Sequence, residues 1–167
     1  MASLTIESPV GALTITDRDG AITRLAWGRA AKAVETPLLR RAARQLEAYF
    51  AGRLRHFDLP LAPEGTAHRR RVWRAMVEIP FGETESYGSM ARRLGSAAQA
   101  VGQACGANPI PVIVPCHRVV AASGLGGFSG GAGVATKEIL LAHEAGLAAE
   151  TQDPVTQDPV TKRARAG

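Results

Sequence analysis

Alternation of apolar and polar residues in the first 27 positions is the feature that most restricts the fold. The segments 4–6, 13–16 and 22–27 alternate, and Pro9, Gly11 and the dipeptide Asp19-Gly20 separate them. Short alternating runs joined by turn residues predict a small antiparallel sheet. A sheet of this size buries one face, which a following helix can cover.

Such a helix follows at once. Thr36 and Pro37 supply an N-cap and a first-turn proline, and apolar residues recur at helical spacing up to Phe50. Residues 53–65 hold two prolines and a glycine with little periodicity, which is typical of a connection. We therefore predict a sheet-plus-helix domain over residues 1–64.

The remainder of the chain has mainly helical patterns. We expect an amphipathic helix over 66–79, a short helix from the Ser86 cap to Leu94, a turn at Gly95, and another short helix over 97–105. Two short helices joined by a glycine turn suggest a helix-turn-helix.

One more helix is expected near the end of the chain. Thr136 can cap a helix that runs to about Glu144, with Gly146 as its stop. The predicted fold is therefore α+β, with a mainly helical second domain over 65–147. Residues 148–167, which repeat the sequence TQDPV, are expected to form a disordered tail.

Composition narrows the functional classes. A net charge of +5 favours a polyanionic partner. No apolar stretch reaches the ~20 residues that cross a bilayer, and residues 1–20 do not resemble a secretory signal. We expect a cytoplasmic protein whose two cysteines, Cys105 and Cys116, are free thiols. The N-terminal region has no cysteine and histidine set for a zinc site, so no metal is expected.

Cys116 is the candidate nucleophile. It lies in the pentapeptide Pro115-Cys116-His117-Arg118-Val119, beside a base and a cation that could help form the reactive thiolate. In an extended segment, neighbouring side chains point to opposite sides, so His117 serves Cys116 only where the chain turns or a water bridges them. The alternative is a buried cysteine beside an unrelated histidine.

A carboxylate further along the chain could orient the histidine. Glu144 shares a helix face with Leu140 and Leu141, which favours an inward position, where a carboxylate needs a partner. His117 is the obvious candidate, giving Glu144, His117 and Cys116 as orienting group, base and nucleophile. A surface position for Glu144 is the alternative.

The candidate residues lie in motifs whose order along the chain is that of a known protein family. The motifs at 72–88, 100–102, 108–109, 115–119, 126–131 and 137–144 closely resemble the O6-alkylguanine-DNA alkyltransferases. The resemblance is strong over residues 66–146 and rests on pattern and position before them. It implies direct transfer of an alkyl group from guanine O6 to Cys116, without a cofactor. Because the resulting thioether is stable, each molecule would react once.

The resemblance also assigns roles around the reacting atoms. Glu144, His117 and a water would deprotonate the thiol, Tyr87 would donate a hydrogen bond to the departing guanine, and Asn108 would brace the active segment. The carbonyls of Cys116 and Val119 would read the exocyclic amine, and the glycine loop would close over the base. The full set of expected substrate contacts is Val119, Phe128, Ser129, Gly130, Gly131 and Lys137.

The implied partner is double-stranded DNA that contains O6-alkylguanine, with no membrane and no stable oligomer. The target base must leave the stack, and the family places its second short helix in the minor groove. The expected DNA contacts are Ala97, Ala98, Gln99, Ala100, Gly102, Arg71, Arg92, Arg93 and Arg118.

Several positions depart from the family pattern. The arginine that ordinarily holds the gap left by the flipped base is Gln99, the loop tyrosine is Phe128, and the segment 131–137 is slightly longer than usual. Cys105 could be buried filler, an auxiliary thiol or a redox partner of Cys116.

These departures keep other functions open. The first is a diverged alkyl acceptor that acts on single strands, free alkylated bases or a small metabolite. A non-enzymatic damage-binding protein is less compatible, because that class replaces the acceptor cysteine. A cysteine hydrolase is a third alternative.

Overall fold

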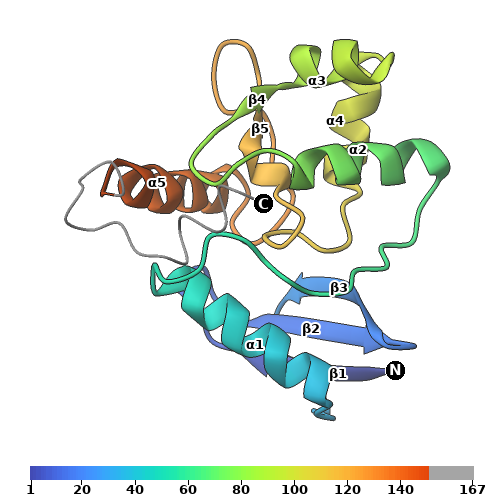
Figure 1. The fold of residues 1–167 in the computed structure, drawn as a ribbon, viewed down its shortest axis with the longest axis vertical. Coiled ribbons are helices and arrows are strands. Elements are labelled where there is room, and N and C mark those ends of the chain that lie inside the picture. The colour runs from blue at the N-terminus through green and yellow to red at the C-terminus, as the bar shows by residue number, and fades with distance from the viewer. Residues whose placement is uncertain (151–167) are drawn as a thin grey trace.

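A computed structural model describes residues 1–150 of the chain. A three-stranded sheet and one helix form a lower layer, and the remaining helices and two very short strands lie above it (Figure 1). The predicted α+β class is confirmed. The elements are β1 (Ala2–Ile6), β2 (Leu13–Arg18), β3 (Ala21–Trp27), α1 (Pro37–Phe50), α2 (Ala67–Val77), β4 (Glu85–Ser86), α3 (Tyr87–Leu94), α4 (Ala98–Gly106), a 3-10 turn (Cys116–Arg118), β5 (Val119–Val120) and α5 (Val134–Glu150).

The expected antiparallel sheet forms with β2 in the middle. Asp19 and Gly20 join β2 to β3 with φ angles of 52° and 81°. Positive φ angles at both central residues define a two-residue hairpin turn whose twist matches that of the paired strands. The dipeptide Asp-Gly favours this turn. Leu13 and Ile15 are fully buried and belong to the core that the sheet shares with α1.

Helix α1 begins and packs as its sequence predicts. The Thr36 hydroxyl accepts a hydrogen bond from the Leu39 amide at 3.1 Å, and Pro37 occupies the first turn. Leu39, Leu46 and Tyr49 are fully buried on one stripe. Tyr49 lies near the C-terminal end of the helix, where α1 meets the upper layer (Figure 1).

The predicted pair of short helices is also present. Ser86 caps α3 by accepting from the Ser89 amide, and Gly95 ends that helix in the left-handed conformation at φ 63°. Helix α4 then starts after Ala97, without a side-chain cap. The indole nitrogen of Trp73 in α2 donates to the Ala104 carbonyl at 2.8 Å, which holds α4 against the buried side of α2.

The last helix differs from its prediction. Helix α5 starts at Val134 rather than after Thr136, and it continues through Gly146 to Glu150. A helical glycine costs roughly 1 kcal/mol relative to alanine, but Leu147 packs over Gly52, and Arg55 donates to the Leu147 carbonyl at 2.5 Å. These contacts explain why Gly146 does not end the helix. The start of the predicted tail, 148–150, is thus helical, and the rest of it lies outside the described residues.

The connection between the layers is paired with the sheet. Near its end, the amide of Ile22 donates to the Pro60 carbonyl and the amide of Ala62 donates to the Ile22 carbonyl, both at 2.8 Å. These bonds hold residues 60–62 along the edge of β3. Across residues 1–150, no helix has both the length and the apolar character required to cross a membrane.

Candidate active site

Cys116 begins a single 3-10 turn that extends to Arg118, and only 7% of the residue is exposed. In such a turn, successive side chains are about 120° apart, whereas in an extended strand they point to opposite sides. The turn therefore meets the condition under which His117 can serve Cys116. Val112, four residues earlier, has a φ of 73°, which is a strained conformation for a β-branched residue. The segment leading to the thiol therefore depends on surrounding bonds to keep its shape.

Asn108 supplies two of those bonds. Its side-chain amide donates to the Val114 carbonyl at 2.8 Å, and its side-chain oxygen accepts from the Ile110 amide at 3.0 Å. The backbone adds bonds from Val114 to Ile110 and from Cys116 to Val114. Together these contacts fix the segment 108–116 as one unit, with Cys116 at its end.

Glu144 collects several hydrogen-bond donors in the interior. Tyr49 donates its hydroxyl at 2.6 Å, His117 Nε2 lies 2.6 Å away, and Arg118 donates through Nε at 2.8 Å and Nη2 at 3.0 Å. The amide of Gly82 adds a longer bond of 3.3 Å. Burial alone would raise the pKa of Glu144, but the bonds and charges of His117 and Arg118 outweigh it and hold that pKa far below its usual range. The carboxylate is therefore ionised.

The ionised carboxylate fixes the tautomer of His117. Because Glu144 can only accept, Nε2 must carry the hydrogen, and Nδ1 keeps its lone pair. Nδ1 is buried and has no hydrogen-bond partner among residues 1–150. Burial lowers the pKa of His117, against the opposing effect of Glu144, so the ring is neutral near pH 7 and can accept a proton.

The two thiols differ in the groups that favour their ionisation. Burial raises the pKa of Cys116, while hydrogen bonding from Asn108 and the charge of Lys137 oppose that rise. Burial, and then the neighbouring Cys116, raise the pKa of Cys105 to about 12; the charge of Lys137 opposes that rise as well, but Cys105 has no hydrogen bond from Asn108 to favour its thiolate. Both thiols are protonated at neutral pH, so a reaction at Cys116 needs a base in the same step.

Lys137 lies behind the site rather than at its surface. Its buried ammonium donates to the Val119 carbonyl at 2.7 Å and to the Gly127 carbonyl at 3.1 Å. It does not line the two cavities at Cys116, so its expected contact with the substrate stays a prediction. It instead ties β5 to the glycine loop.

Two cavities meet at Cys116. One, of about 420 Å³, lies between Tyr87, helix α4 and the glycine loop at 127–129. The other, of about 470 Å³, reaches from Cys116 to β3. They share four lining residues, namely Cys105, Cys116, Phe128 and Ser129. Burial, and then the charges that the two thiols can carry, raise the pKa of Tyr87, so its hydroxyl remains a donor.

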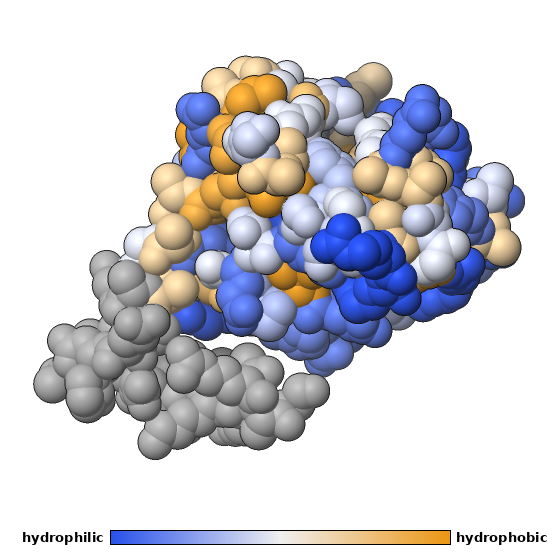
Figure 2. Space-filling model, turned by 90° about the horizontal axis from the view of Figure 1, so that it is seen from above, coloured by the Kyte–Doolittle hydropathy of each residue, from blue (hydrophilic) through white to orange (hydrophobic). Residues whose placement is uncertain are grey.

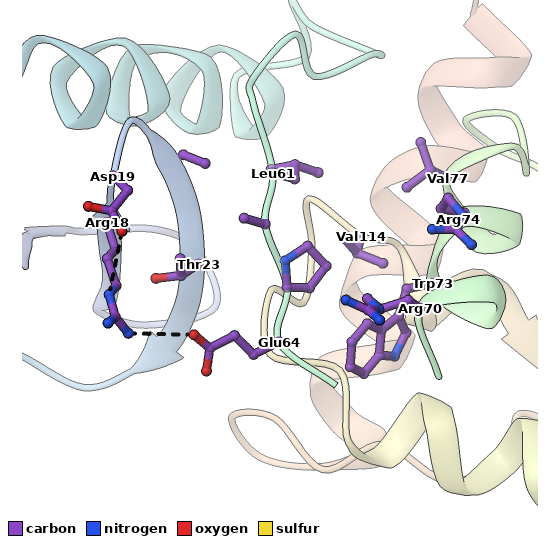
Figure 3. A pocket seen from close by; sticks show the side chains of 13 residues that line it. Arg18, Asp19, Thr23, Leu61, Glu64, Arg70, Trp73, Arg74, Val77 and Val114 are labelled. Atoms are coloured by element: carbon purple, nitrogen blue, oxygen red, sulfur yellow. Dashed lines mark ion pairs between the residues drawn. The ribbon is translucent and has the colours of Figure 1, made fainter. Parts of the chain in front are cut away.

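A larger cavity, of about 630 Å³, lies elsewhere, between the β2–β3 turn and α2 (Figure 3). Arg18 pairs there with Glu64 at 3.5 Å, and the Trp73 indole nitrogen is already used by Ala104. No thiol, imidazole or phenol lines this cavity. The described residues also hold no group of three or more metal-ligating side chains. Cys116 therefore remains the candidate reactive residue.

Two family models together match most of the chain. The family model described as the DNA-binding domain of 6-O-methylguanine DNA methyltransferase matches residues 67–146, and the model of its ribonuclease-like domain matches residues 1–63.

The chain belongs to the 6-O-methylguanine DNA methyltransferase family.

Curated relatives carry the name methylated-DNA–protein-cysteine methyltransferase, and the enzyme class expected from the sequence is confirmed. The protein of Methanosarcina acetivorans is 44% identical over 81% of this chain and 92% of its own length. That of Mycolicibacterium paratuberculosis is 45% identical over 84% and 90%. The structure of Mycobacterium tuberculosis OGT in complex with DNA is 45% identical, with a TM-score of 0.77 over 86% of this chain and 92% of that chain.

In this member of the family, α4 presents small residues to solvent. Ala97, Ala98 and Gln99 are exposed, Ala100 and Gly102 are half-buried, and a Cβ added at Gly102 would meet open space. Viewed from above Figure 1, the molecule shows strongly hydrophilic residues close to a hydrophobic patch (Figure 2). Gly102 also lines the cavity at Tyr87, so this cavity borders α4.

The expected DNA-contacting arginines separate into two groups. Arg118 is 6% exposed and bonds to Glu144 and to the Ile79 carbonyl, so its assignment to the DNA surface is wrong. Arg71, Arg92 and Arg93 remain exposed. Arg71 donates to the Leu94 carbonyl and Arg93 pairs with Glu85 at 2.7 Å.

Sequence reasoning missed two contributors from the N-terminal layer. Tyr49 bonds to Glu144, and Trp27 contacts the glycine loop through Phe128, with ring centres 6.0 Å apart. A tyrosine on the buried stripe of a helix signals a hydroxyl that needs a partner, which could have indicated Tyr49. Trp27 lies in a segment with a strand pattern, and no neighbouring residue in the sequence indicates that it contacts the glycine loop.

Proposed function

We propose that this methyltransferase repairs DNA by moving an alkyl group from guanine O6 to the sulfur of Cys116. The observation that carries the proposal is the buried Glu144–His117 pair adjoining Cys116 where two cavities meet. In the step, a sulfur–carbon bond forms as the carbon–O6 bond breaks. The thiol proton passes to His117, and guanine leaves with the electron pair of the broken bond.

Proton transfer uses the free nitrogen of His117. Nδ1 accepts the thiol proton through a bridging water, and the resulting imidazolium remains in contact with the Glu144 carboxylate. Arg118 and Tyr49 hold that carboxylate in place throughout. Because the groups are already oriented, little reorganisation is needed when charge develops.

The leaving guanine meets donors and acceptors on the cavity wall. Tyr87 keeps its proton and donates a hydrogen bond as negative charge grows on the base. The Cys116 and Val119 carbonyls read the exocyclic amine. Each already accepts one hydrogen bond, from the Val119 amide and from Lys137 respectively, and each retains a second lone pair.

The expected contacts of the glycine loop fit closure over the base. Phe128 and Ser129 line both cavities, and Gly130 and Gly131 line the one that reaches β3. The product is a thioether on Cys116. Since a thioether does not release its alkyl group under these conditions, each molecule acts once.

Delivery of the base is assigned to α4. Its small exposed residues can approach the minor groove, Gln99 fills the gap left by a flipped nucleotide, and exposed arginines such as Arg92 contact phosphate. The partner is then duplex DNA that contains O6-alkylguanine.

Gln99 also supports a second candidate function, in which single-stranded DNA or a free alkylated base is the preferred substrate. Glutamine lacks the charge and stacking plane of arginine, so it holds a gap in the duplex less well.

The test is a mass spectrum after incubation with a duplex that contains O6-methylguanine. One methyl group is expected on the peptide with Cys116, none in Cys116→Ser, and the same adduct in Cys105→Ser. No adduct in the natural protein, or an adduct on Cys105 alone, contradicts the proposal. A faster reaction with the single strand than with the duplex would favour the second candidate.

A further inference from the structure

We propose that Trp27, in the N-terminal sheet, sets the size of the alkyl group that Cys116 accepts. This inference rests on the proposed function. It concerns the cavity of about 470 Å³ that runs from Cys116 to β3, which is far larger than a methyl group requires. Leu25, Ala26 and Trp27 of β3 form its wall on the N-terminal side.

The geometry of displacement assigns the two cavities. The attacking sulfur and the departing oxygen must lie on opposite sides of the reacting carbon. With guanine in the cavity beside Tyr87 and α4, any further atoms on that carbon project sideways from the sulfur. The cavity toward β3 adjoins the same sulfur, so it receives them.

Trp27 is held firmly enough to act as a wall. Its indole nitrogen donates to the Val10 carbonyl at 3.0 Å, and its ring meets Phe128 edge-on at an interplanar angle of 89°. The amide of Leu25 also donates to the Pro109 carbonyl at 2.9 Å, which joins β3 to the segment that carries Cys116.

The glycine loop lies directly against this ring. A Cβ added to Gly130 would come within 2.4 Å of the indole, and one added to Gly131 within 2.8 Å. At Gly130 the two nearest atoms to that Cβ both belong to the indole of Trp27, and at Gly131 only the Thr136 hydroxyl lies nearer than the indole. A change in the volume of residue 27 therefore changes the space available beside Phe128 and Cys116.

The experiment compares two duplexes that differ only in O6-methylguanine or O6-benzylguanine at one position. Single-turnover rate constants give a benzyl-to-methyl ratio in which the cost of base flipping largely cancels. In Trp27→Ala we expect the ratio to rise about tenfold, the scale on which an apolar pocket distinguishes groups of different size. Trp27→Phe should change it much less, and Leu4→Ala, a control in the same sheet, should leave it unchanged.

Gly130→Ala tests the opposite change. Its methyl group intrudes between the loop and the indole, so the ratio should fall, and Trp27→Ala in the same chain should restore it. The Gly130→Ala variant also tests the proposal if Trp27→Ala does not fold. A benzyl-to-methyl ratio that does not fall in Gly130→Ala overturns the proposal.

The remaining outcomes are distinct. An unchanged ratio in folded Trp27→Ala, even with both rates reduced, shows that Trp27 only supports the loop and overturns the proposal. Absence of any alkyl group on Cys116 in the natural protein would instead contradict the proposed function on which it rests.

Discussion

The reactive centre and the exposed side of α4 are built in opposite ways. Glu144 is 1% exposed and has donors from α1, from the turn at Cys116 and from Gly82. Gln99 on α4 is exposed, and its side chain has no hydrogen bond to another described residue. Changes at the centre should therefore alter stability and chemistry together, whereas changes on α4 should alter only the encounter with DNA.

The largest effect is expected for Glu144→Gln. An amide cannot replace the charge that balances Arg118, and leaving a buried ion without its partner costs about 3–5 kcal/mol of unfolding free energy. Loss of the group that orients His117 should slow alkyl transfer by roughly 10²–10⁴-fold. Denaturant unfolding measures the loss of stability, and single-turnover kinetics measure the loss of transfer rate. Glu138→Gln, on the exposed side of α5, is the matched control; an equal loss there would remove the distinction.

Acidification should lower both the stability of the protein and the rate of alkyl transfer. The pKa of His117 lies below its usual 6.5 in the folded protein, so the unfolded state binds more protons as pH falls below 6.5, and stability decreases. The lowered pKa of Glu144 acts in the same direction at lower pH, because its contribution is present above 4.5 and is lost on acidification. Transfer should stay constant through pH 6.5 and then fall by about tenfold per pH unit below the pKa of His117. A rise in stability on acidification would contradict this account.

The two tyrosines sharpen the comparison further. Tyr49→Phe removes a donor to a buried carboxylate and should cost roughly 1.5–3 kcal/mol of unfolding free energy. Tyr87→Phe removes a donor from the cavity wall and should mainly slow transfer, with a small effect on stability. Measuring both quantities in both variants tests the contrast. Equal losses of stability would place Tyr87 in the same network as Tyr49.

The smallest effect is expected on α4. Gln99→Arg should speed transfer from duplex DNA by roughly two- to fivefold, the equivalent of about 0.5–1 kcal/mol for an exposed cation against an aromatic ring. The rate with a single strand and the unfolding free energy should not change, because Gln99 contacts no other part of the described structure through hydrogen bonds. A change in stability would show that α4 is not independent of the centre.

Features set by neighbouring residues were predictable from the sequence. The Asp19-Gly20 turn, the Ser86 cap and the Gly95 helix end depend on a few adjacent positions, and the structure has all three. The inward turn of Glu144 followed from its helix face, and the family resemblance indicated the reactive motif.

Contacts between distant segments were not predictable in this way. Tyr49 and Glu144 are 95 residues apart in sequence, and the contact of Trp27 with Phe128 also crosses the two layers. The expected DNA contact of Arg118 is wrong because a buried carboxylate 26 residues away in sequence binds its guanidinium, and no pattern near Arg118 indicates that pairing. The extension of α5 through Gly146 likewise depends on packing against Gly52 and Arg55.

The near-complete enclosure of Cys116 bears on how long the protein lasts in the cell. Under the proposed single-turnover reaction, a molecule whose thiol is modified by an oxidant or electrophile is lost for repair, just as one that has accepted an alkyl group is. With 7% of the residue exposed and a pKa raised by burial, the sulfur offers little thiolate to such reagents. If the proposed function holds, the number of active molecules should then depend on the number of lesions repaired rather than on the time since synthesis.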